Sequence, residues 1–247
     1  MFTKVKTDKE IEDMRSSGKI LSQVLDVVEA MVEPGVSGVD IDRAAKKELK
    51  ALGAEAPFLG YQGFPAAICV SINDVVEHGI PKPQPFEDGD IVSLDLGAQY
   101  NGMITDSGRS IVAGKATKEV EQLLETTKRS LMAGIDAVKD GVKVGQISAA
   151  IQKVLDSKGY GIVQDLVGHG VGHQLHEDPN IPNYGSANEG PILKKGMTIA
   201  IEPMATLGGY KLKVDPDGWT IRTVDGSLAV HFEHTILITD KGAEILT

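Results

Sequence analysis

Hydrophobic residues recur at helical spacing in four stretches of this chain and therefore predict four amphipathic helices. In the first stretch, for example, Ile20 and Val24 fall on one face. The four predicted helices cover residues 10–31, 40–52, 118–138 and 145–158. Asp40 is suited to cap the second helix, because its side chain can accept hydrogen bonds from free backbone N–H groups. Gly53 and Gly159 are suited to end the second and fourth helices in the left-handed conformation.

After each pair of predicted helices, the pattern changes to alternation with a period of two and becomes rich in β-branched residues. Such segments are typical of strands with one buried face. The predicted strands cover residues 67–72 and 91–96 in the first half of the chain, and 198–201 and 228–239 in the second. Helix pairs followed by strands, twice over, indicate an α+β fold with pseudo-two-fold symmetry.

A faint internal repeat at an offset of 106 residues supports this symmetry. The matching residues lie in and around the shorter helices. Gly35, Val36, Ile41, Ala44, Leu49 and Gly53 recur as Gly141, Val142, Ile147, Ala150, Leu155 and Gly159. We therefore expect a single domain over residues 1–247 built from two pseudo-repeats, approximately 1–113 and 114–247, with a site in the cleft between them. Chance similarity between two pairs of amphipathic helices is the alternative explanation.

Composition limits the class of protein. With 247 residues, 41% of them hydrophobic, the chain is long enough for one large domain or two small ones. Its net charge of −10 disfavours binding to nucleic acids, which depends on Lys and Arg, and to anionic membranes. The single cysteine, Cys69, excludes an intramolecular disulfide and a zinc site built from several cysteines. Residues 1–6 run directly into charged positions, and no apolar run is long enough for a signal peptide or a transmembrane helix. We expect a cytoplasmic protein.

The segment 91–106 carries a strong hairpin signal, because Asn101-Gly102 suits a type I′ turn with positive φ at both central residues. Counting outward from this turn pairs residue 97 with Asp106, and Asp95 with residue 108. Both carboxylates then face the same side of the hairpin, one diagonal step apart. They would repel each other unless a cation or a shared proton compensates. Exposure of both side chains to solvent is the alternative.

Three of the six histidines lie in one glycine-rich segment: His169, His173 and His176. Its glycines disfavour a helix, so His169 and His173 are not the zinc-binding pair of an HExxH helix. The glycines on either side of His169 allow close approach of the backbone while one imidazole is presented. A single histidine could be a structural residue, but three in such a segment indicate a site.

Two glutamates lie within apolar, strand-like sequence. Glu202 ends an apolar run that begins at Met197, and Glu233 lies in the apolar segment 228–238. A carboxylate in such surroundings is costly unless it is paired, protonated or bound to a metal, although either could also face outward from a half-buried strand. Added to the aspartate pair and the histidine above, these acids complete a set of four carboxylates and one imidazole. Such a set suits two adjacent divalent ions.

At these residues the sequence resembles the type I methionine aminopeptidases, in the bacterial form without an N-terminal zinc-finger extension. The resemblance covers nearly the whole chain, and the order Asp, Asp, His, Glu, Glu of the candidate ligands is highly specific for the pita-bread superfamily. The matching motifs are Gly60-Tyr61, Ser71-Ile-Asn-Asp-Val-Val-Glu-His78-Gly-Ile-Pro81, the 95–106 hairpin, Gly168-His169-Gly-Val-Gly, Gly196-Met-Thr-Ile-Ala-Ile-Glu202-Pro-Met and Glu233-His-Thr. The resemblance implies a pita-bread fold, in which helices flank a central antiparallel sheet.

The resemblance also implies a role for each matching residue. The five metal ligands of the family correspond to Asp95, Asp106, His169, Glu202 and Glu233, of which the second aspartate and the last glutamate bridge the two metals. His78 and His176 correspond to histidines that contact the substrate and the tetrahedral intermediate. The pocket for the methionine side chain corresponds to Tyr61, Phe64, Cys69, Leu175 and Trp219, to which we add Phe58.

The sequence departs from the family pattern around the pocket and the metal site. Gln62 replaces a frequent His, Phe58 a frequent Cys and Leu175 a frequent Phe, while Gly97 stands where close relatives often have Thr and His173 lies at a variable position. These departures bear on the shape of the pocket and the surroundings of the metals. They leave the expected reaction class unchanged.

The resemblance implies an enzyme that removes the N-terminal initiator methionine from nascent proteins and peptides when the second residue is small. We expect a hydroxide that bridges two divalent ions to attack the first peptide carbonyl, with Glu202 as general base and with His78 and His176 donating hydrogen bonds to the developing charge. The ligand set accepts Co²⁺, Mn²⁺, Fe²⁺ or Zn²⁺. The expected partners are the N-termini of nascent polypeptides, at the ribosome or free of it, and the expected state is a monomer.

Two other functions compete with this one. A proline-specific aminopeptidase shares the superfamily, although such enzymes usually carry an additional N-terminal domain. A non-catalytic peptide- or ribosome-binding module could use the same fold, but members that lose activity should lose metal ligands, and all five positions are filled here.

Overall fold

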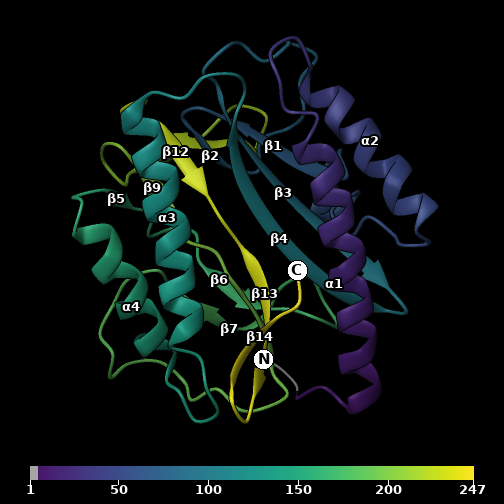
Figure 1. Ribbon diagram of the computed structural model, residues 1–247, viewed down its shortest axis with the longest axis vertical. Coiled ribbons are helices and arrows are strands. Elements are labelled where there is room, and N and C mark those ends of the chain that lie inside the picture. Colours follow the sequence, from purple (N-terminus) through teal and green to yellow (C-terminus); the bar gives the residue numbers. More distant parts are fainter. Residues whose placement is uncertain (1–4) are drawn as a thin grey trace.

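Two pairs of helices flank a set of antiparallel strands in the computed structural model, which describes residues 5–247 (Figure 1). Residues 1–4, on which part of the expectation about the N-terminus depends, lie outside the described residues. The helices are α1 (Asp8–Glu29), α2 (Gly38–Ala51), α3 (Lys118–Asp136) and α4 (Val144–Asp156), with a 3₁₀ turn, η1, at Tyr61–Gly63. All four predicted helices are confirmed to within two residues at each end.

The second helix begins earlier than predicted, because a serine rather than Asp40 caps its N-terminus. The Ser37 side chain accepts a hydrogen bond from the backbone N–H of Asp40, and the Asp40 carboxylate accepts one from the backbone N–H of Ser37. This reciprocal pair is a capping box, so Asp40 occupies the third helical position and the prediction for it is wrong. The prediction for the C-terminal glycines is confirmed, since Gly53 and Gly159 have φ angles of 73° and 70°.

The strands alternate with the helix pairs along the chain. They are β1 (Ile68–Ile72), β2 (Val75–Glu77), β3 (Ile91–Tyr100), β4 (Met103–Val112), β5 (Gly161–Ile162), β6 (Gly168–Gly170), β7 (Glu177–Ile181), β8 (Thr198–Ile201), β9 (Met204–Thr206), β10 (Leu212–Val214), β11 (Ile221–Thr223), β12 (Ala229–His231), β13 (His234–Thr239) and β14 (Gly242–Ile245). Their order is β1-β3-β4 in one sheet, β14-β13-β8-β6-β7 in the largest, and β12-β9-β5 and β10-β11-β2 in two small ones. Helices on antiparallel strands confirm the predicted α+β class.

The hairpin predicted from Asn101-Gly102 is present with the predicted register. Asn101 and Gly102 have φ angles of 50° and 81°, as a type I′ turn requires. Residue Gly97 pairs with Asp106, and Asp95 pairs with Gly108. Strand β3 continues to Tyr100, beyond the predicted end at residue 96, so the two strands stay paired up to the turn.

The strand predicted over residues 228–239 is two strands, because the chain changes partners at Phe232 and Glu233. β12 pairs with β9, whereas β13 pairs with β8 and β14. At the break, the backbone of Glu233 turns to β4 instead: its N–H donates to the carbonyl of Gly108 at 2.9 Å. The interruption therefore lies at one of the candidate metal ligands.

Hydrogen bonds around this break join the first half of the chain to the second, and we call them the β4–β13 seam. The hydroxyl of Ser107 donates to the carbonyl of Glu233 at 2.8 Å. The hydroxyl of Thr235 accepts from the backbone N–H of Asp106 at 2.9 Å and donates to its carbonyl at 2.8 Å. Figure 1 shows β13 running beside β4 at the centre of the molecule. The seam thus fixes Asp106 and Glu233 relative to each other.

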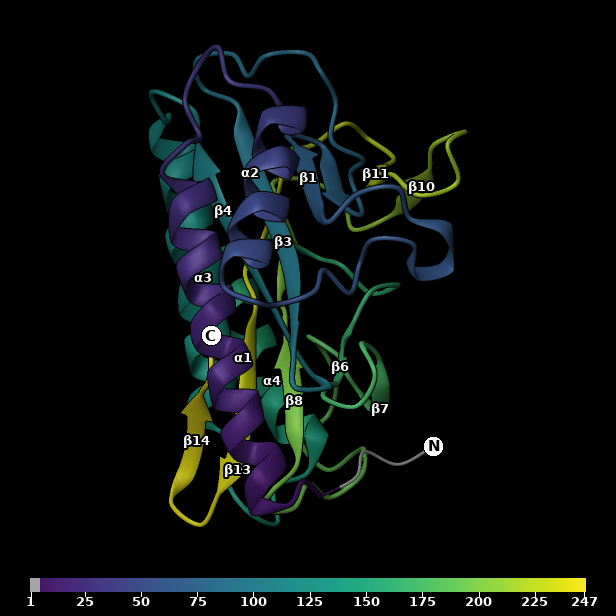
Figure 2. The same cartoon turned by 90° about the vertical axis from the view of Figure 1, so that its right-hand side faces the viewer.

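Each helix pair covers its own part of the strands. α1 packs on β3 and β4 and α2 on β1, around a buried cluster that includes Leu21, Leu25 and Leu94. α3 packs on β8, β9 and β12 and α4 on β5 and β7, around a second cluster that includes Ile147 and Ile199. In Figure 2, α1 and α3 lie on one side of β3 and β8, and β6, β7, β10 and β11 lie on the other. The relation of the two halves as sequence repeats stays a prediction.

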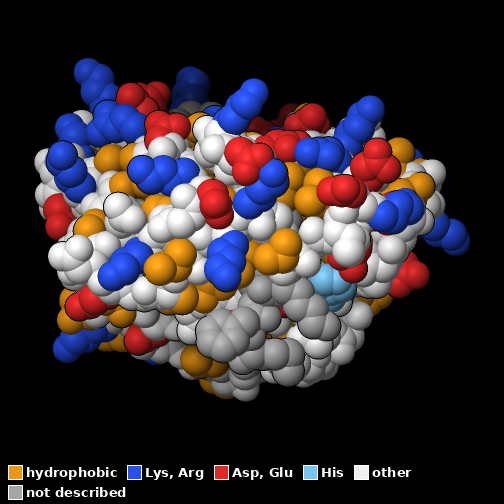
Figure 3. All heavy atoms as spheres, turned by 90° about the horizontal axis from the view of Figure 1, so that it is seen from below, with side chains coloured by type: hydrophobic (Ala, Val, Ile, Leu, Met, Phe, Trp, Pro, Cys, Tyr) orange, Lys and Arg blue, Asp and Glu red, His pale blue; other side chains and the backbone are white. Residues whose placement is uncertain are grey.

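Charges of both signs are mixed on the surface. On the face shown in Figure 3, acidic and basic side chains are interspersed, with hydrophobic side chains between them. Over residues 5–247, no helix combines the length and apolar character needed to cross a membrane.

The hairpin turn can be tested at Gly102, which is exposed and has open space where a Cβ would be added. We expect Gly102→Ala to lower the free energy of unfolding by about 1–2 kcal/mol, because alanine resists positive φ. Gly102→Asn is the matched control and should lose clearly less, since asparagine tolerates this conformation. Urea denaturation measures both. Equal losses in the two variants would contradict a cause in the backbone.

Candidate metal centre and substrate pocket

A cavity of about 560 Å³ is lined by all the residues for which the sequence predicts a role. This volume is typical of sites for small ligands. The five predicted metal ligands line it: Asp95, Asp106, His169, Glu202 and Glu233. The predicted substrate contacts line it as well: Phe58, Tyr61, Phe64, Cys69, His78, Leu175, His176 and Trp219. The acidic cluster and the apolar pocket are therefore parts of one site.

The β3–β4 hairpin contributes Asp95 and Asp106. Both side chains are buried, so the alternative that they face solvent is wrong. Burial and the neighbouring Asp106 raise the pKa of Asp95 well above its ordinary value. Burial and the carboxylate of Glu77 raise the pKa of Asp106 to about 7. Two acids held this close resist ionisation unless a positive charge lies between them.

Glu202 and Glu233 enter the same cavity from the second half of the chain. Glu202 directly follows β8, and Glu233 lies at the break between β12 and β13. Both are buried rather than outward-facing. Burial raises the pKa of each well above its ordinary value, and the carboxylate of Asp106 adds to the effect on both.

His169 is presented by the short strand β6 with one ring nitrogen available. Its Nδ1 lies 2.9 Å from the carbonyl of Gly170, so Nδ1 carries the proton and Nε2 keeps its lone pair. Nε2 lies 3.5 Å from Oε1 of Glu202. Burial and the neighbouring His176 lower the pKa of His169 to about 3, which favours the neutral ring that a metal binds. A Cβ at Gly168 would come within 2.4 Å of the carbonyl of Ala200, so this glycine permits the close approach of β6 to β8.

These residues could hold divalent cations. Ligand atoms of Asp106, His169 and Glu233 lie within 4.8 Å of one another. Oδ1 of Asp95 and Oε1 of Glu233 are buried oxygens without a hydrogen-bond partner among the described residues. A bound cation would supply both the missing partner and the compensating charge. The chemistry of the donor set therefore fits a divalent metal centre.

His176 and His78 lie on the substrate side of the cavity. Nδ1 of His176 lies 2.9 Å from the hydroxyl of Tyr61, and its ring is 4.4 Å from that of His169. A tyrosine hydroxyl that donates to Nδ1 leaves the proton on Nε2, which becomes a hydrogen-bond donor. Burial and His78 lower the pKa of His176. His78 has a φ of 56°, a strained conformation for a residue other than glycine.

The third histidine of the glycine-rich segment has a different role. Nε2 of His173 lies 2.7 Å from Oε1 of Glu10, and its backbone N–H donates to Glu177. His173 therefore ties the segment to α1. This contact joins residues far apart in sequence, and no local pattern predicts it.

Aromatic and aliphatic side chains form the apolar part of the cavity. Phe58, Phe64, Cys69 and Leu175 belong to one buried cluster, and Tyr61 and Trp219 pack against it. The rings of Phe64 and Trp219 meet edge to face with centroids 5.1 Å apart. Burial and the carboxylate of Asp95 raise the pKa of the Cys69 thiol, which keeps it neutral. The pocket is thus suited to an apolar side chain.

Two departures from the family pattern contact each other. A Cβ at Gly97 would come within 2.7 Å of the ring of Pro57 and 3.0 Å of the ring of Phe58. Phe58 therefore occupies the space above β3 that a side chain at position 97 would need. The glycine and the phenylalanine are complementary, and Phe58 lines the pocket.

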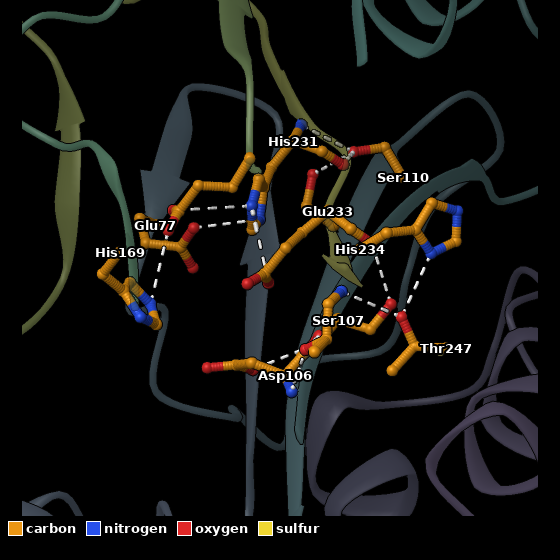
Figure 4. Close-up of polar contacts among 12 residues, drawn as sticks. Glu77, Asp106, Ser107, Ser110, His169, His231, Glu233, His234 and Thr247 are labelled. Carbon is orange, nitrogen blue, oxygen red and sulfur yellow. Dashed lines mark hydrogen bonds and ion pairs between the residues drawn. The ribbon is translucent and has the colours of Figure 1, made fainter. Parts of the chain in front are cut away.

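Two buried residues beside the acidic cluster were not predicted from the sequence. Glu77 and His231 form an ion pair in which Nδ1 lies 2.9 Å from Oε2 (Figure 4). Burial alone would raise the pKa of Glu77, but the nearby charge of His231 lowers it to about 2. In the sequence, only their positions could have indicated a role in the site: Glu77 precedes His78, and His231 lies two residues before Glu233.

Comparison with known proteins agrees with this geometry. Residues 12–240 match metallopeptidase family M24. A methionine aminopeptidase from Clostridium acetobutylicum is 46% identical over 244 residues, with 98% of each chain covered. Methionine aminopeptidase 1 from Bacillus subtilis is 43% identical over 242 residues, again with 98% of each chain covered.

Solved structures show the same fold. The methionine aminopeptidase of Thermotoga maritima matches with a TM-score of 0.98 and 44% identity, covering 100% of this chain and 99% of that chain. The prolidase of Pyrococcus furiosus matches with a TM-score of 0.79 and 26% identity, but only 65% of that chain is covered. The predicted pita-bread fold is therefore confirmed. The chain belongs to metallopeptidase family M24 and, within it, to the methionine aminopeptidases.

Proposed function

We propose that this enzyme removes N-terminal methionine from polypeptides whose second residue is small, by metal-assisted hydrolysis of the first peptide bond. The proposal rests on one cavity that contains both a cluster of metal-binding side chains and an apolar pocket. On one side, ligand atoms of Asp106, His169 and Glu233 lie within 4.8 Å of one another. On the other side lies the aromatic pocket of Phe64 and Trp219. A peptide whose first side chain fills the pocket would present its first carbonyl to the metal centre.

We assign Asp95, Asp106, His169, Glu202 and Glu233 as ligands of two divalent ions, with Co²⁺, Mn²⁺, Fe²⁺ and Zn²⁺ as candidates. Four carboxylates outnumber what one small cation needs, and their raised pKa values reflect charge that one ion would compensate only in part. Bound at these ligands, the ions would lower the pKa of a coordinated water and polarise the scissile carbonyl.

The protein itself moves the proton and binds the developing charge. Glu202 accepts a proton from the attacking water and passes it to the leaving amine. His176 donates from Nε2 to the carbonyl oxygen as negative charge develops, since Tyr61 holds the ring in the required tautomer. His78, at the end of β2 on the same side of the cavity, is the second donor, and its strained backbone fixes where its ring points.

The pocket supports methionine over other first residues. Phe58, Phe64 and Trp219 offer ring faces and edges to a thioether, and Cys69 and Leu175 close the apolar wall. The side chains that form this pocket are uncharged, as is the side chain of methionine. The natural substrates would be the N-termini of nascent polypeptides in the cytoplasm, and the enzyme would act as a monomer.

A peptide panel tests this function. Metal-stripped protein, resupplied with Co²⁺, Mn²⁺, Fe²⁺ or Zn²⁺ in turn, should release methionine from Met-Ala-Ser and leave Met-Leu-Ser and Ala-Pro-Ser intact. Amino-acid analysis measures the products. Hydrolysis of the proline peptide would favour the proline-specific alternative. A protein that holds no stoichiometric metal and releases no methionine would be a binding module.

His176 can be tested separately from the metals. We expect His176→Ala to lower kcat by about 10²–10³ because one donor to the transition state is lost. Its content of bound metal should equal that of the wild type, as measured by atomic absorption. Tyr61→Phe keeps the imidazole and removes only the contact that sets its tautomer, so it should lose less. A near-normal kcat in His176→Ala would remove this residue from the mechanism.

The burial of Asp106 beside other carboxylates predicts a pH dependence in the metal-free protein. Because folding raises the pKa of Asp106 from 3.8 to about 7, its contribution to stability is complete below pH 4 and is lost as the pH rises to 7. Asp106→Asn has no such group. Relative to this variant, the free energy of unfolding of the wild type should fall by up to about 4 kcal/mol over that range.

Urea denaturation in the presence of a chelator measures this difference. Asp156→Asn, at the exposed end of α4, is the control and should give a curve parallel to the wild type at every pH. If the curves of Asp106→Asn and the wild type were parallel, folding would not raise the pKa of Asp106.

A further inference from the structure

Glu77 and His231 are buried beside the candidate metal centre, yet neither has a part in the mechanism above. Their side chains are 5% and 1% exposed. A buried charged pair contributes little to stability compared with apolar side chains of the same size. A second role would explain why charged groups occupy this place.

The imidazole of His231 points at Glu202 and Glu233, the two candidate carboxylate ligands from the second half of the chain. Its Nε2 lies 3.8 Å from Oε2 of Glu202 and 4.0 Å from Oε2 of Glu233. Its Nδ1 faces Glu77 at 2.9 Å. Figure 4 shows the ring of His231 between Glu77 and Glu233. An imidazole in this position connects one carboxylate outside the ligand set to two inside it.

Glu202 lies between two imidazoles, and each of its oxygens faces a different one. Oε1 is 3.5 Å from Nε2 of His169, whereas Oε2 is 3.8 Å from Nε2 of His231. If Oε1 and His169 bind the same ion, Oε2 is the oxygen left for a second contact. His231 is thus placed to hold the carboxylate from the side away from His169.

The backbone of His231 is hydrogen-bonded to β4, and its ring lies against Gly108 of the same strand. Its backbone N–H donates to the hydroxyl of Ser110 at 2.9 Å, and that hydroxyl lies 2.8 Å from the backbone carbonyl of His231. A Cβ at Gly108 would come within 2.7 Å of Cε1 of the ring, so a glycine at this point of β4 leaves room for it. The position of the ring is therefore set by β4, next to the β4–β13 seam.

We propose that Glu77 and His231 form a carboxylate–imidazole pair that positions Glu202 and Glu233 for metal binding. Glu77 orients the ring through Nδ1, and the N–H at Nε2 attracts the two carboxylates. His231 acts through the ligands and is a positioning residue. The inference rests on the proposed metal ligands, but not on the choice of methionine as substrate.

The role of this pair is tested by measuring metal affinity in the absence of peptide. Co²⁺ is titrated into metal-stripped protein against a chelator of known affinity. We expect His231→Leu to weaken binding by about 10–100-fold, as is typical when a partner of a metal ligand is removed. His231→Gln keeps an N–H donor and should stay within a few-fold of the wild type. Glu77→Gln should also weaken Co²⁺ binding. This variant provides a second measurement if His231→Leu does not fold.

His234→Leu is the matched control. His234 is also an imidazole next to Glu233, but its ring points away toward Thr247, 3.2 Å from the hydroxyl (Figure 4). This variant should bind Co²⁺ as the wild type does. The visible absorption spectrum of the Co²⁺-saturated His231→Leu protein should match that of the wild type, because no ligand is lost.

Three results would overturn the proposal. They are unchanged Co²⁺ affinity in His231→Leu, equal weakening in His231→Gln and His231→Leu, and a Co²⁺ spectrum in His231→Leu that shows the loss of a nitrogen ligand. The last would make His231 a ligand itself. Failure of the wild type to bind Co²⁺ would instead contradict the proposed metal chemistry, and a different peptide specificity would contradict the proposed substrate.

Discussion

Mutual repulsion among four carboxylates buried around one cavity is the constraint on which the rest of this structure depends. Asp95, Asp106, Glu202 and Glu233 all have pKa values raised by burial and by one another, and no Lys or Arg among the described residues lines the cavity. Only a bound cation or bound protons can balance this charge at low cost. Metal binding and the stability of this part of the fold are therefore coupled.

The fold holds these acids in place through connections between its two halves. One pair comes from a hairpin whose turn fixes the register, and the other comes from the ends of short strands in the second half. The β4–β13 seam joins the two sets through backbone atoms and the hydroxyls of Ser107 and Thr235. These seam contacts use backbone atoms and hydroxyls and leave out the carboxylate oxygens.

Unusual residues around the site occur as contacting pairs. The ring of Phe58 fills the space left by Gly97, and the ring of His231 fills the space left by Gly108. In each pair a glycine on the hairpin lets a bulky ring approach the backbone. One pair shapes the pocket for the substrate and the other lies behind the metal ligands. These two glycines of the hairpin therefore leave room for one ring at the pocket and for another behind the metal ligands.

Features that depend on local chemistry follow from the sequence alone. The conformational demands of Asn101-Gly102 gave the hairpin, its register and the Asp95–Asp106 pair, and periodicity gave the four helices. Local chemistry was ambiguous at α2, where both Ser37 and Asp40 can cap and only the capping box shows which does. Tertiary structure decided the rest. It interrupted the strand at Glu233, brought Glu202 to His169, and paired Glu77 with His231 across more than half of the chain. Such contacts depend on which strands pair, and no spacing within a single segment encodes that choice.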